Sequence, residues 1–191
     1  MKWNFSRLRH CCPGCCSRPL DSVIDVGASE LTIHVGKAGV FSAVGHEHWV
    51  EAPISEGRIR EGPDALVEFA VDARRMSVKP DEKTSAGERV SIQETMQRTV
   101  LESEKYPEIR FRSTQVTPAG AQAWKVTGTL TLHGVSKAVV ADVRRESDAY
   151  IGTARFNQTD FGIQPVRIAG GVVRVKNQLE INFKIRPRQG N

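Results

Sequence analysis

The feature that most constrains the fold is an alternation of apolar and polar residues with a period of two. It is clearest in QLEINFKIR, residues 178–186, where Leu179, Ile181, Phe183 and Ile185 alternate with Glu180, Asn182, Lys184 and Arg186. The same alternation recurs in LTIHV, ALVEFAVDA, EIRFRS, KVTGTLTLHG, AVVADVRRE and YIGTARF. Successive side chains of a strand point to opposite faces, so these segments predict strands that are buried on one face and wet on the other. That pattern is typical of antiparallel sheets.

Turn signals separate the alternating segments, among them EGPDA, VKPDE, TPAGA and RESDA. About eight or nine closely spaced strands follow one another without helices between them, which excludes a doubly wound α/β fold. A chain of 191 residues suits one domain with a single core. The pattern therefore favours an all-β antiparallel sandwich or closed barrel.

One segment breaks the period of two. In SAGERVSIQETMQRTVLESEKYP, residues 85–107, apolar residues lie four apart at Ile92, Met96 and Val100, with good helix formers between them. This spacing predicts one helix or two short ones that end before Pro107. Its single apolar stripe predicts that the helix packs against the β-structure.

Residues 1–20 differ in composition from the rest of the chain. They hold four basic residues and no acidic residue, so they account for most of the formal net charge of +5. They also contain all four cysteines, in CCPGCC at residues 11–16. We expect a disordered basic leader, although CCPGCC could also bind a soft metal or be an engineered tag. The nearly neutral remainder argues against a nucleic-acid-binding surface.

No apolar stretch follows the first basic residues, so the N-terminus does not resemble a signal peptide. No segment approaches the length of apolar sequence that an integral membrane span needs. From the chain as written, we expect a cytoplasmic protein.

The stretch GHEHW, residues 45–49, carries the strongest hint of chemistry. On a strand His46 and His48 would point the same way, and a third histidine, His34 or His133, could complete an open zinc site. The spacing is common by chance, and Glu47 would point to the opposite face, away from a zinc-bound water. Histidines that form hydrogen bonds near a strand end are the alternative interpretation.

Phenylalanines are spread along the predicted strands, at Phe41, Phe69, Phe111, Phe156, Phe161 and Phe183. Eight or so strands can close around a filled core or around a space for one small ligand. The pattern alone leaves both possibilities open.

Three ordered motifs add a resemblance. EKYPEIRFRSTQV is followed by WKVTGTLTLHGVSKAV and then by FNQTDFGI, with matches at residues 106–113, 126–137 and 158–163. In these motifs the chain resembles the YceI-like family of polyisoprenoid-binding, lipocalin-like bacterial proteins, and the resemblance extends over roughly residues 22–187.

The resemblance implies an antiparallel lipocalin-like β-barrel of about eight strands over residues 21–188, with one or two short helices packed against it. It implies an apolar channel for a lipid with a polyprenyl or quinone-type tail, no enzymatic activity, no cofactor and no metal. Such proteins are usually periplasmic, and a role in stress response is a further expectation. The residues expected to line the channel are Phe41, Phe69, Phe111, Leu130, Leu132, Phe156, Phe161 and Phe183.

For the polar head group of the lipid we expect His46, His48 and Arg112 as hydrogen-bond donors. Two other functions stay open. One is a zinc-dependent enzyme that uses His46, His48 and a third histidine. The other is a stress-associated interaction protein whose barrel is simply a filled core.

Overall fold

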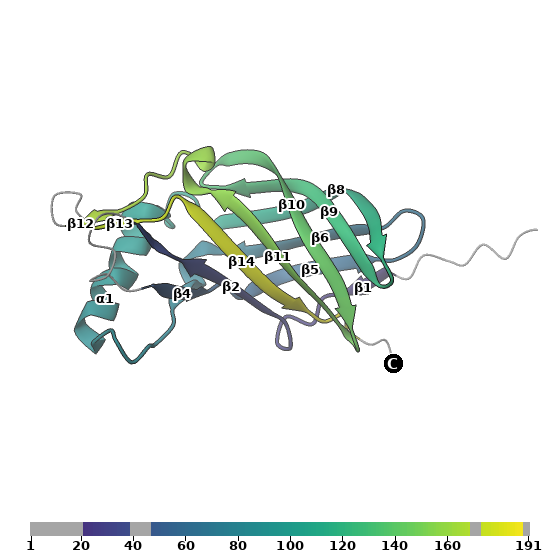
Figure 1. Ribbon diagram of the computed structural model, residues 1–191, viewed down its shortest axis with the longest axis horizontal. Helices are drawn as coiled ribbons and strands as arrows, with labels where there is room; N and C mark the ends of the chain where they lie inside the picture. Colours follow the sequence, from purple (N-terminus) through teal and green to yellow (C-terminus); the bar gives the residue numbers. More distant parts are fainter. Residues whose placement is uncertain (1–20, 39–46, 169–172, 189–191) are drawn as a thin grey trace, which may run out of the picture.

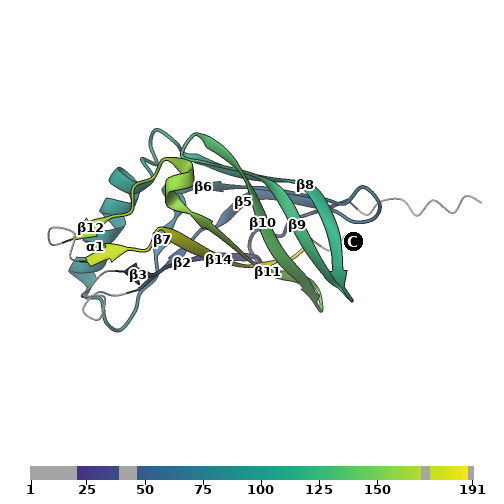
Figure 2. The same cartoon turned by 45° about the horizontal axis from the view of Figure 1, so that its top comes forward.

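The computed structural model describes residues 21–38, 47–168 and 173–188 (Figure 1). The predicted leader, residues 1–20, lies outside the described residues, as do Phe41 and His46. The described chain is an elongated, strongly curved antiparallel sheet with one α-helix near one end (Figures 1 and 2). We call this the helix end, and the opposite end the far end.

Eleven strands form the main sheet, in the order β1-β5-β6-β8-β9-β10-β11-β14-β2-β4-β7. Four of the ten neighbouring pairs, β5-β6, β8-β9, β9-β10 and β10-β11, are also consecutive along the chain, as in hairpins. The strands are β1 (Asp21–Val23), β2 (Glu30–Val35), β4 (His48–Glu51), β5 (Ile54–Arg60), β6 (Leu66–Asp72), β7 (Ser77–Val78), β8 (Glu108–Gly120), β9 (Ala123–Leu132), β10 (Val135–Glu146), β11 (Ala149–Asn157) and β14 (Gln178–Ile185).

The sheet closes into a barrel because β4 and β5, which lie near opposite edges of the sheet, follow one another directly along the chain. Only Ala52 and Pro53 separate β4, which pairs with β2, from β5, which pairs with β6. Counting β4 and β5 as one bent strand, eight strands make the wall, with β1 and β7 as additions. The expected barrel of about eight strands is therefore confirmed, although the sheet has more hydrogen-bonded strands than expected. At the far end, an isolated bridge between Ile24 and Pro187 joins the chain after β1 to the chain after β14.

A smaller sheet and the helical segment lie at the helix end (Figure 2). The small sheet has the order β12-β13-β3. Its strands are β3 (Lys37–Ala38), β12 (Arg167–Ile168) and β13 (Val173–Val175). The helical elements are α1 (Ala86–Thr95), the π-helical turn η2 (Met96–Val100), and the short 3-10 turns η1 (Ala73–Arg75) and η3 (Gln158–Phe161).

The predicted helix is present and its start has a local cause. Ser85 accepts a hydrogen bond from the backbone N–H of Glu88, whose carboxylate accepts one from the backbone N–H of Ser85. This capping box satisfies backbone donors that would otherwise lack partners. The helical path ends with η2, before Pro107, as expected from the sequence.

Two glutamines hold the helix to the barrel. The amide of Gln93 donates to Met76 O and accepts from Val78 N, and the amide of Gln97 donates to Ala73 O and Met76 O. The two residues lie four apart and so share one face of the helical segment. α1 itself buries no residue completely. These side-chain amides contact backbone groups of η1, Met76 and β7, and the apolar stripe of Ile92, Met96 and Val100 packs against the hydrophobic core as predicted.

A second junction links the chain after η2 to the β9–β10 hairpin. His133 and Gly134, both with positive φ, form the hairpin turn. The Nε2 atom of His133 lies 2.7 Å from Glu102 Oε2, and the Tyr106 ring lies 4.3 Å from the His133 ring. A Cβ at Gly134 would lie 2.8 Å from the Tyr106 ring, so glycine leaves the space that this ring needs. We call Glu102, Tyr106, His133 and Gly134 the hairpin junction.

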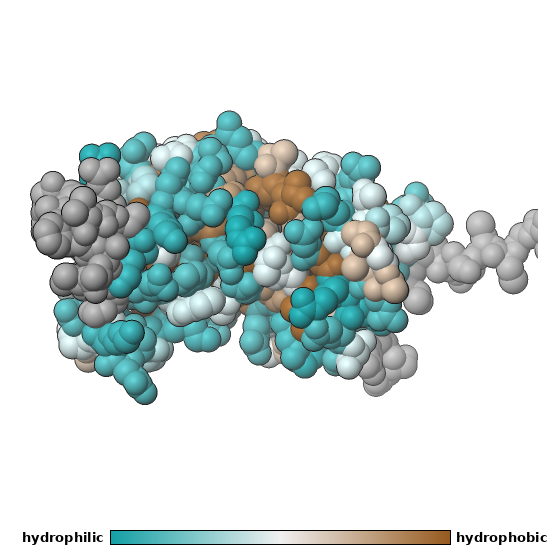
Figure 3. All heavy atoms as spheres, viewed as in Figure 1, coloured by the Kyte–Doolittle hydropathy of each residue, from teal (hydrophilic) through white to brown (hydrophobic). Residues whose placement is uncertain are grey.

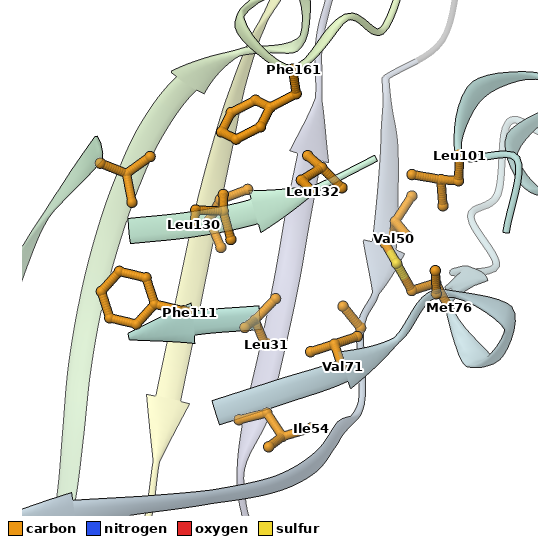
Figure 4. Packing of buried hydrophobic residues seen from close by; sticks show 14 of the residues in the cluster. Leu31, Val50, Ile54, Val71, Met76, Leu101, Phe111, Leu130, Leu132 and Phe161 are labelled. Atoms are coloured by element: carbon orange, nitrogen blue, oxygen red, sulfur yellow. The ribbon is translucent and has the colours of Figure 1, made fainter. Parts of the chain in front are cut away.

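The two faces of the sheet differ as the alternation predicts. The view in Figure 3 is mostly hydrophilic, with apolar residues in scattered places. The inner face is apolar: Leu31, Val71, Phe111 and Leu130 point into the barrel from four different strands (Figure 4).

Candidate functional site

The barrel interior is hollow. A cavity of about 1120 Å³ extends from residues of α1 and η2 at the helix end to Glu61, Arg145 and Tyr150 at the far end. This volume slightly exceeds the usual range of about 300–1,000 Å³ for small-molecule pockets. The cavity therefore has room for a long ligand.

The wall between the two ends is apolar. It is formed by the inward residues of every barrel strand, which alternate with outward polar residues as strand geometry requires. Its middle section includes Leu31, Val50, Val71, Phe111, Val126, Leu130, Val139, Ala154, Ile181 and Phe183. The question left open by the sequence, a filled core or a cavity, is thus answered by the structure in favour of a cavity.

Glycines explain why the phenylalanines do not fill the lumen. A Cβ at Gly128 of β9 would lie 2.5 Å from Phe111 Cζ, and one at Gly152 of β11 would lie 2.4 Å from Phe183 Cζ. Each ring therefore lies against the backbone of a neighbouring strand. Because these two inward positions carry no side chain, the rings spread along the wall and leave the centre open.

Most of the residues expected to line the channel do so. Phe161 is fully buried and does not line the cavity, because its ring packs edge-on against Phe156, with the centroids 5.1 Å apart. Phe41 lies outside the described residues. The expected residues that line the cavity are Phe69, Phe111, Leu130, Leu132, Phe156 and Phe183.

At the helix end the cavity meets polar side chains. His48 lines it, and its Nδ1 lies 3.9 Å from Asp81 Oδ2. The Asp81 carboxylate accepts hydrogen bonds from the Thr84 hydroxyl and the Lys83 backbone N–H, and the first of these contributes most to lowering the pKa of Asp81. His48 thus occupies a position from which it could reach a polar group of a ligand. His46, expected to act with it, lies outside the described residues.

Arg112 does not line the cavity, so the head-group role expected for it does not fit its position. It follows the inward residue Phe111 in β8, and alternation places it on the outer face. There its side chain is 64% exposed, and its Nη1 donates to Glu68 Oε2 at 2.9 Å.

Of the histidines proposed as zinc ligands, the three that the structure describes, His34, His48 and His133, are not brought together. His34 pairs in register with Trp49, and its Nε2 lies 3.0 Å from Glu47 Oε2. The next register pair, Val35 and His48, lines the cavity, so His34 and His48 lie on opposite faces of the sheet. His133 belongs to the hairpin junction. Among the residues that the structure describes, no three His, Cys, Asp or Glu side chains gather as metal ligands would.

The far end carries a polar cluster that the sequence did not indicate. The Tyr150 hydroxyl donates to Glu61 Oε1 at 2.5 Å, and Arg145 Nη1 lies 3.4 Å from the same oxygen. Burial, with the hydrogen bond to Glu61 as the next contribution, raises the pKa of Tyr150 to about 12. The alternation in the sequence places Tyr150 on the same strand face as Gly152, Ala154 and Phe156, so its inward position could be predicted. Glu61 follows the last residue of a strand, and no sequence pattern indicates where its side chain lies.

The sequence profile of the YceI-like domain matches residues 23–186 of this chain. The chain belongs to the YceI-like family. A UPF0312 protein of Pseudomonas savastanoi is 38% identical over 74 residues, which are 34% of this chain and 38% of that protein. A UPF0312 protein of Vibrio parahaemolyticus is 32% identical over 90 residues, which are 42% of this chain and 47% of that protein. The chain thus spans less than half the length of these relatives.

Solved structures share the fold at low sequence identity. BcnA of Burkholderia cenocepacia superposes with a TM-score of 0.57 at 16% identity, covering 85% of this chain and 98% of BcnA. A polyisoprenoid-binding domain from Saccharophagus degradans superposes with a TM-score of 0.59 at 15% identity, covering 89% of this chain and 98% of that domain. The lipocalin-like barrel expected from the resemblance is therefore confirmed. Within the described residues, no helix is long and apolar enough to cross a membrane.

Proposed function

We propose that this YceI-like protein binds and carries a lipid with an isoprenoid-like tail, without transforming it. The observation that supports this proposal is the apolar cavity of about 1120 Å³ that extends along the barrel. The Saccharophagus degradans relative is described as a polyisoprenoid-binding domain, which supports the same ligand class for this chain.

The physical chemistry of the wall suits this task. Burial of an alkyl chain contributes about 0.8 kcal/mol per CH₂, so the apolar wall can supply affinity without a directed polar contact. Part of this gain offsets the lost freedom of a flexible tail and of the two associating molecules. Apolar attraction is non-directional, so an apolar wall should tolerate tails of somewhat different structure.

The proposal of a carrier also fits the position of the polar groups. Side chains that could act as acids or bases, such as His48 and Glu61, lie near the two ends of the cavity, and the middle section listed above is apolar. A tail that fills this section would meet no polar side chain of the wall there.

Native mass spectrometry of the purified protein, before and after denaturing solvent, tests this function. We expect a releasable adduct in the mass range of a prenyl lipid, or uptake of added geranylgeraniol by the empty protein. Ala154→Trp should reduce binding strongly, because Ala154 lies between Ala141 and Ile181 on the cavity wall. Arg155→Trp is the matched control, since the adjacent side chain is 58% exposed on the outer face.

Unfolding in urea would establish that both variants are folded. If the wild-type protein carries no lipid and takes up none, the proposed function is wrong. Equal uptake by the two tryptophan variants would show that geranylgeraniol binds outside the barrel.

A further inference from the structure

Side chains from opposite parts of the barrel meet at the far end of the cavity. Arg145 and Tyr150 are paired in register across the β10–β11 hairpin, and Glu61 follows β5. In the order of the sheet, β6, β8 and β9 lie between β5 and β10. The contacts of Glu61 with Arg145 and Tyr150 therefore cross the end of the barrel. We call Glu61, Arg145 and Tyr150 the far-end cluster.

The fold holds this cluster in place. The backbone N–H of Arg145 donates to Gln122 O in the β8–β9 turn, at 2.8 Å. The guanidinium carbon of Arg145 lies 5.5 Å from the centre of the Tyr150 ring, and the Trp124 ring meets that ring edge-on at 5.9 Å. Trp124, Arg145 and Tyr150 all line the cavity. A ligand that reaches the far end would contact an ordered polar surface with an aromatic side.

The charges of the cluster balance. Glu61 and Arg145 carry opposite charges, and the Tyr150 hydroxyl is neutral at physiological pH, because its ordinary pKa of 10.0 already lies well above that pH and burial raises the pKa further. A phosphate at this place would lie close to the Glu61 carboxylate, which disfavours an anion. A neutral group with an oxygen atom meets no such repulsion.

The hydrogen bonds of Arg145 leave capacity for a ligand. Its guanidinium contacts Glu61, Tyr150 Oη and Ser147 O at 3.4, 3.5 and 3.4 Å, near the upper limit for hydrogen bonds. Guanidinium has five N–H donors, so Arg145 can donate to a further oxygen without giving up these contacts. A hydrocarbon tip at the same place would displace water from these polar groups and replace none of its hydrogen bonds.

We propose that the far-end cluster is a subsite for a neutral oxygen-bearing group of the lipid, a hydroxyl or a carbonyl, bound with the hydrocarbon tail directed toward the helix end. This inference rests on the proposed function. It places the polar group of the lipid at the opposite end of the cavity from His48, the residue that was expected to bind the head group. The Arg145 guanidinium donates to the ligand oxygen, and Trp124 and Tyr150 contact the carbons next to it.

Hexadecanol and hexadecane, delivered from cyclodextrin, test the subsite. Their affinities are measured by the fluorescence of Trp124 in a Trp3→Phe/Trp49→Phe protein. One added hydrogen bond predicts that hexadecanol binds about 3- to 10-fold more tightly than hexadecane. Glu61→Gln/Arg145→Met removes both charges together and should bring this ratio close to one. His48→Leu should leave the ratio unchanged.

Each other result has a distinct meaning. Equal affinity of the two ligands for the parent protein would overturn the subsite and leave the proposed function intact, whereas binding of neither would refute both. A preference that survives in the double variant would overturn the role of Arg145 as the donor, and one that is lost in His48→Leu would place the hydroxyl at the helix end and overturn the subsite.

Brominated hexadecanols determine the orientation without altering the cavity, in case the double variant does not fold. Bromine quenches the fluorescence of a nearby tryptophan. Hexadecanol brominated beside the hydroxyl should quench Trp124 strongly, and hexadecanol brominated at the tail end should quench it weakly. The reverse order would show that the tail occupies the far end and would overturn the subsite.

Discussion

The glycines under the aromatic rings lead to a prediction with a definite sign. Gly152 faces inward on β11, and an added Cβ would lie 2.4 Å from Phe183 Cζ and 2.5 Å from Asp142 O of β10. The ring can rotate away, but the carbonyl belongs to the backbone of the paired strand and cannot. Overpacking of a formed core costs about 1–3 kcal/mol. The lower chain entropy of alanine in the unfolded state offsets about 0.4–1 kcal/mol of this.

We therefore expect Gly152→Ala to lower the free energy of unfolding by about 1–2 kcal/mol, measured by urea denaturation. The matched control is Gly87→Ala in α1, where an added Cβ would meet no atom within 4 Å. There alanine should raise the free energy of unfolding by about 0.5–1 kcal/mol, because it restricts the unfolded chain and favours the helix.

A second variant identifies the cause of the loss. If contact with the Phe183 ring contributes, Gly152→Ala should cost less in a Phe183→Leu background than in the wild type. The coupling in such a cycle should be about 0.5–3 kcal/mol, as for residues in contact. A Gly152→Ala protein within 0.5 kcal/mol of the wild type, or one stabilised like Gly87→Ala, would refute the argument that glycine keeps the ring on the wall.

Three further predictions concern individual ionisable groups. In urea denaturation, Glu102→Ala should lower the free energy of unfolding by about 1 kcal/mol, because it removes the hydrogen bond to His133. The control Glu104→Ala, at an exposed neighbouring position, should change the free energy of unfolding by less than about 0.5 kcal/mol. The free energy of unfolding in urea should fall as the pH is lowered from 6 to 3, because side-chain hydrogen bonds hold the pKa of four carboxyl groups below their ordinary values of 3.8 (Asp) and 4.5 (Glu). The stabilisation by these groups is present above the ordinary values and is lost as the pH falls through the lower pKa of the folded protein. An unchanged stability at pH 3 would contradict this. The four groups are Asp72, Asp81, Glu108 and Glu180. Tyrosinate absorbance should show one tyrosine that titrates near pH 12 and is absent in Tyr150→Phe. Because the pKa of Tyr150 in the folded protein lies above its unfolded value of 10.0, the free energy of unfolding should also fall as the pH rises from 10 to 12. A normal titration of Tyr150 would contradict both expectations.

Much of the fold could be predicted from the sequence because alternation reports directly on which face of a strand is buried. The strand segments, the helical segment before Pro107 and the barrel follow from it and from the resemblance. The same rule shows why the expected role of Arg112 did not fit: Phe111 and Arg112 are neighbours on one strand, so only one of them can face the lumen. The cavity was implied by the resemblance alone and could not be predicted from the alternation, because a phenylalanine that fills a core and one that lies over a glycine give the same pattern.

The motifs that reveal the family are informative about the fold and part of the apolar wall, such as Phe111 and Leu130, rather than about the polar groups at the ends of the cavity. The first and second motifs supply Tyr106, His133 and Gly134, which form the hairpin junction, and the third supplies the fully buried Phe161. The far-end cluster lies outside all three matched segments, and its members are separated by up to 89 positions in the chain. The three motifs therefore carry no information on the polar groups at the far end of the cavity. For this reason the identity of the lipid has to be sought at the ends of the cavity, where the few polar side chains of its wall are placed.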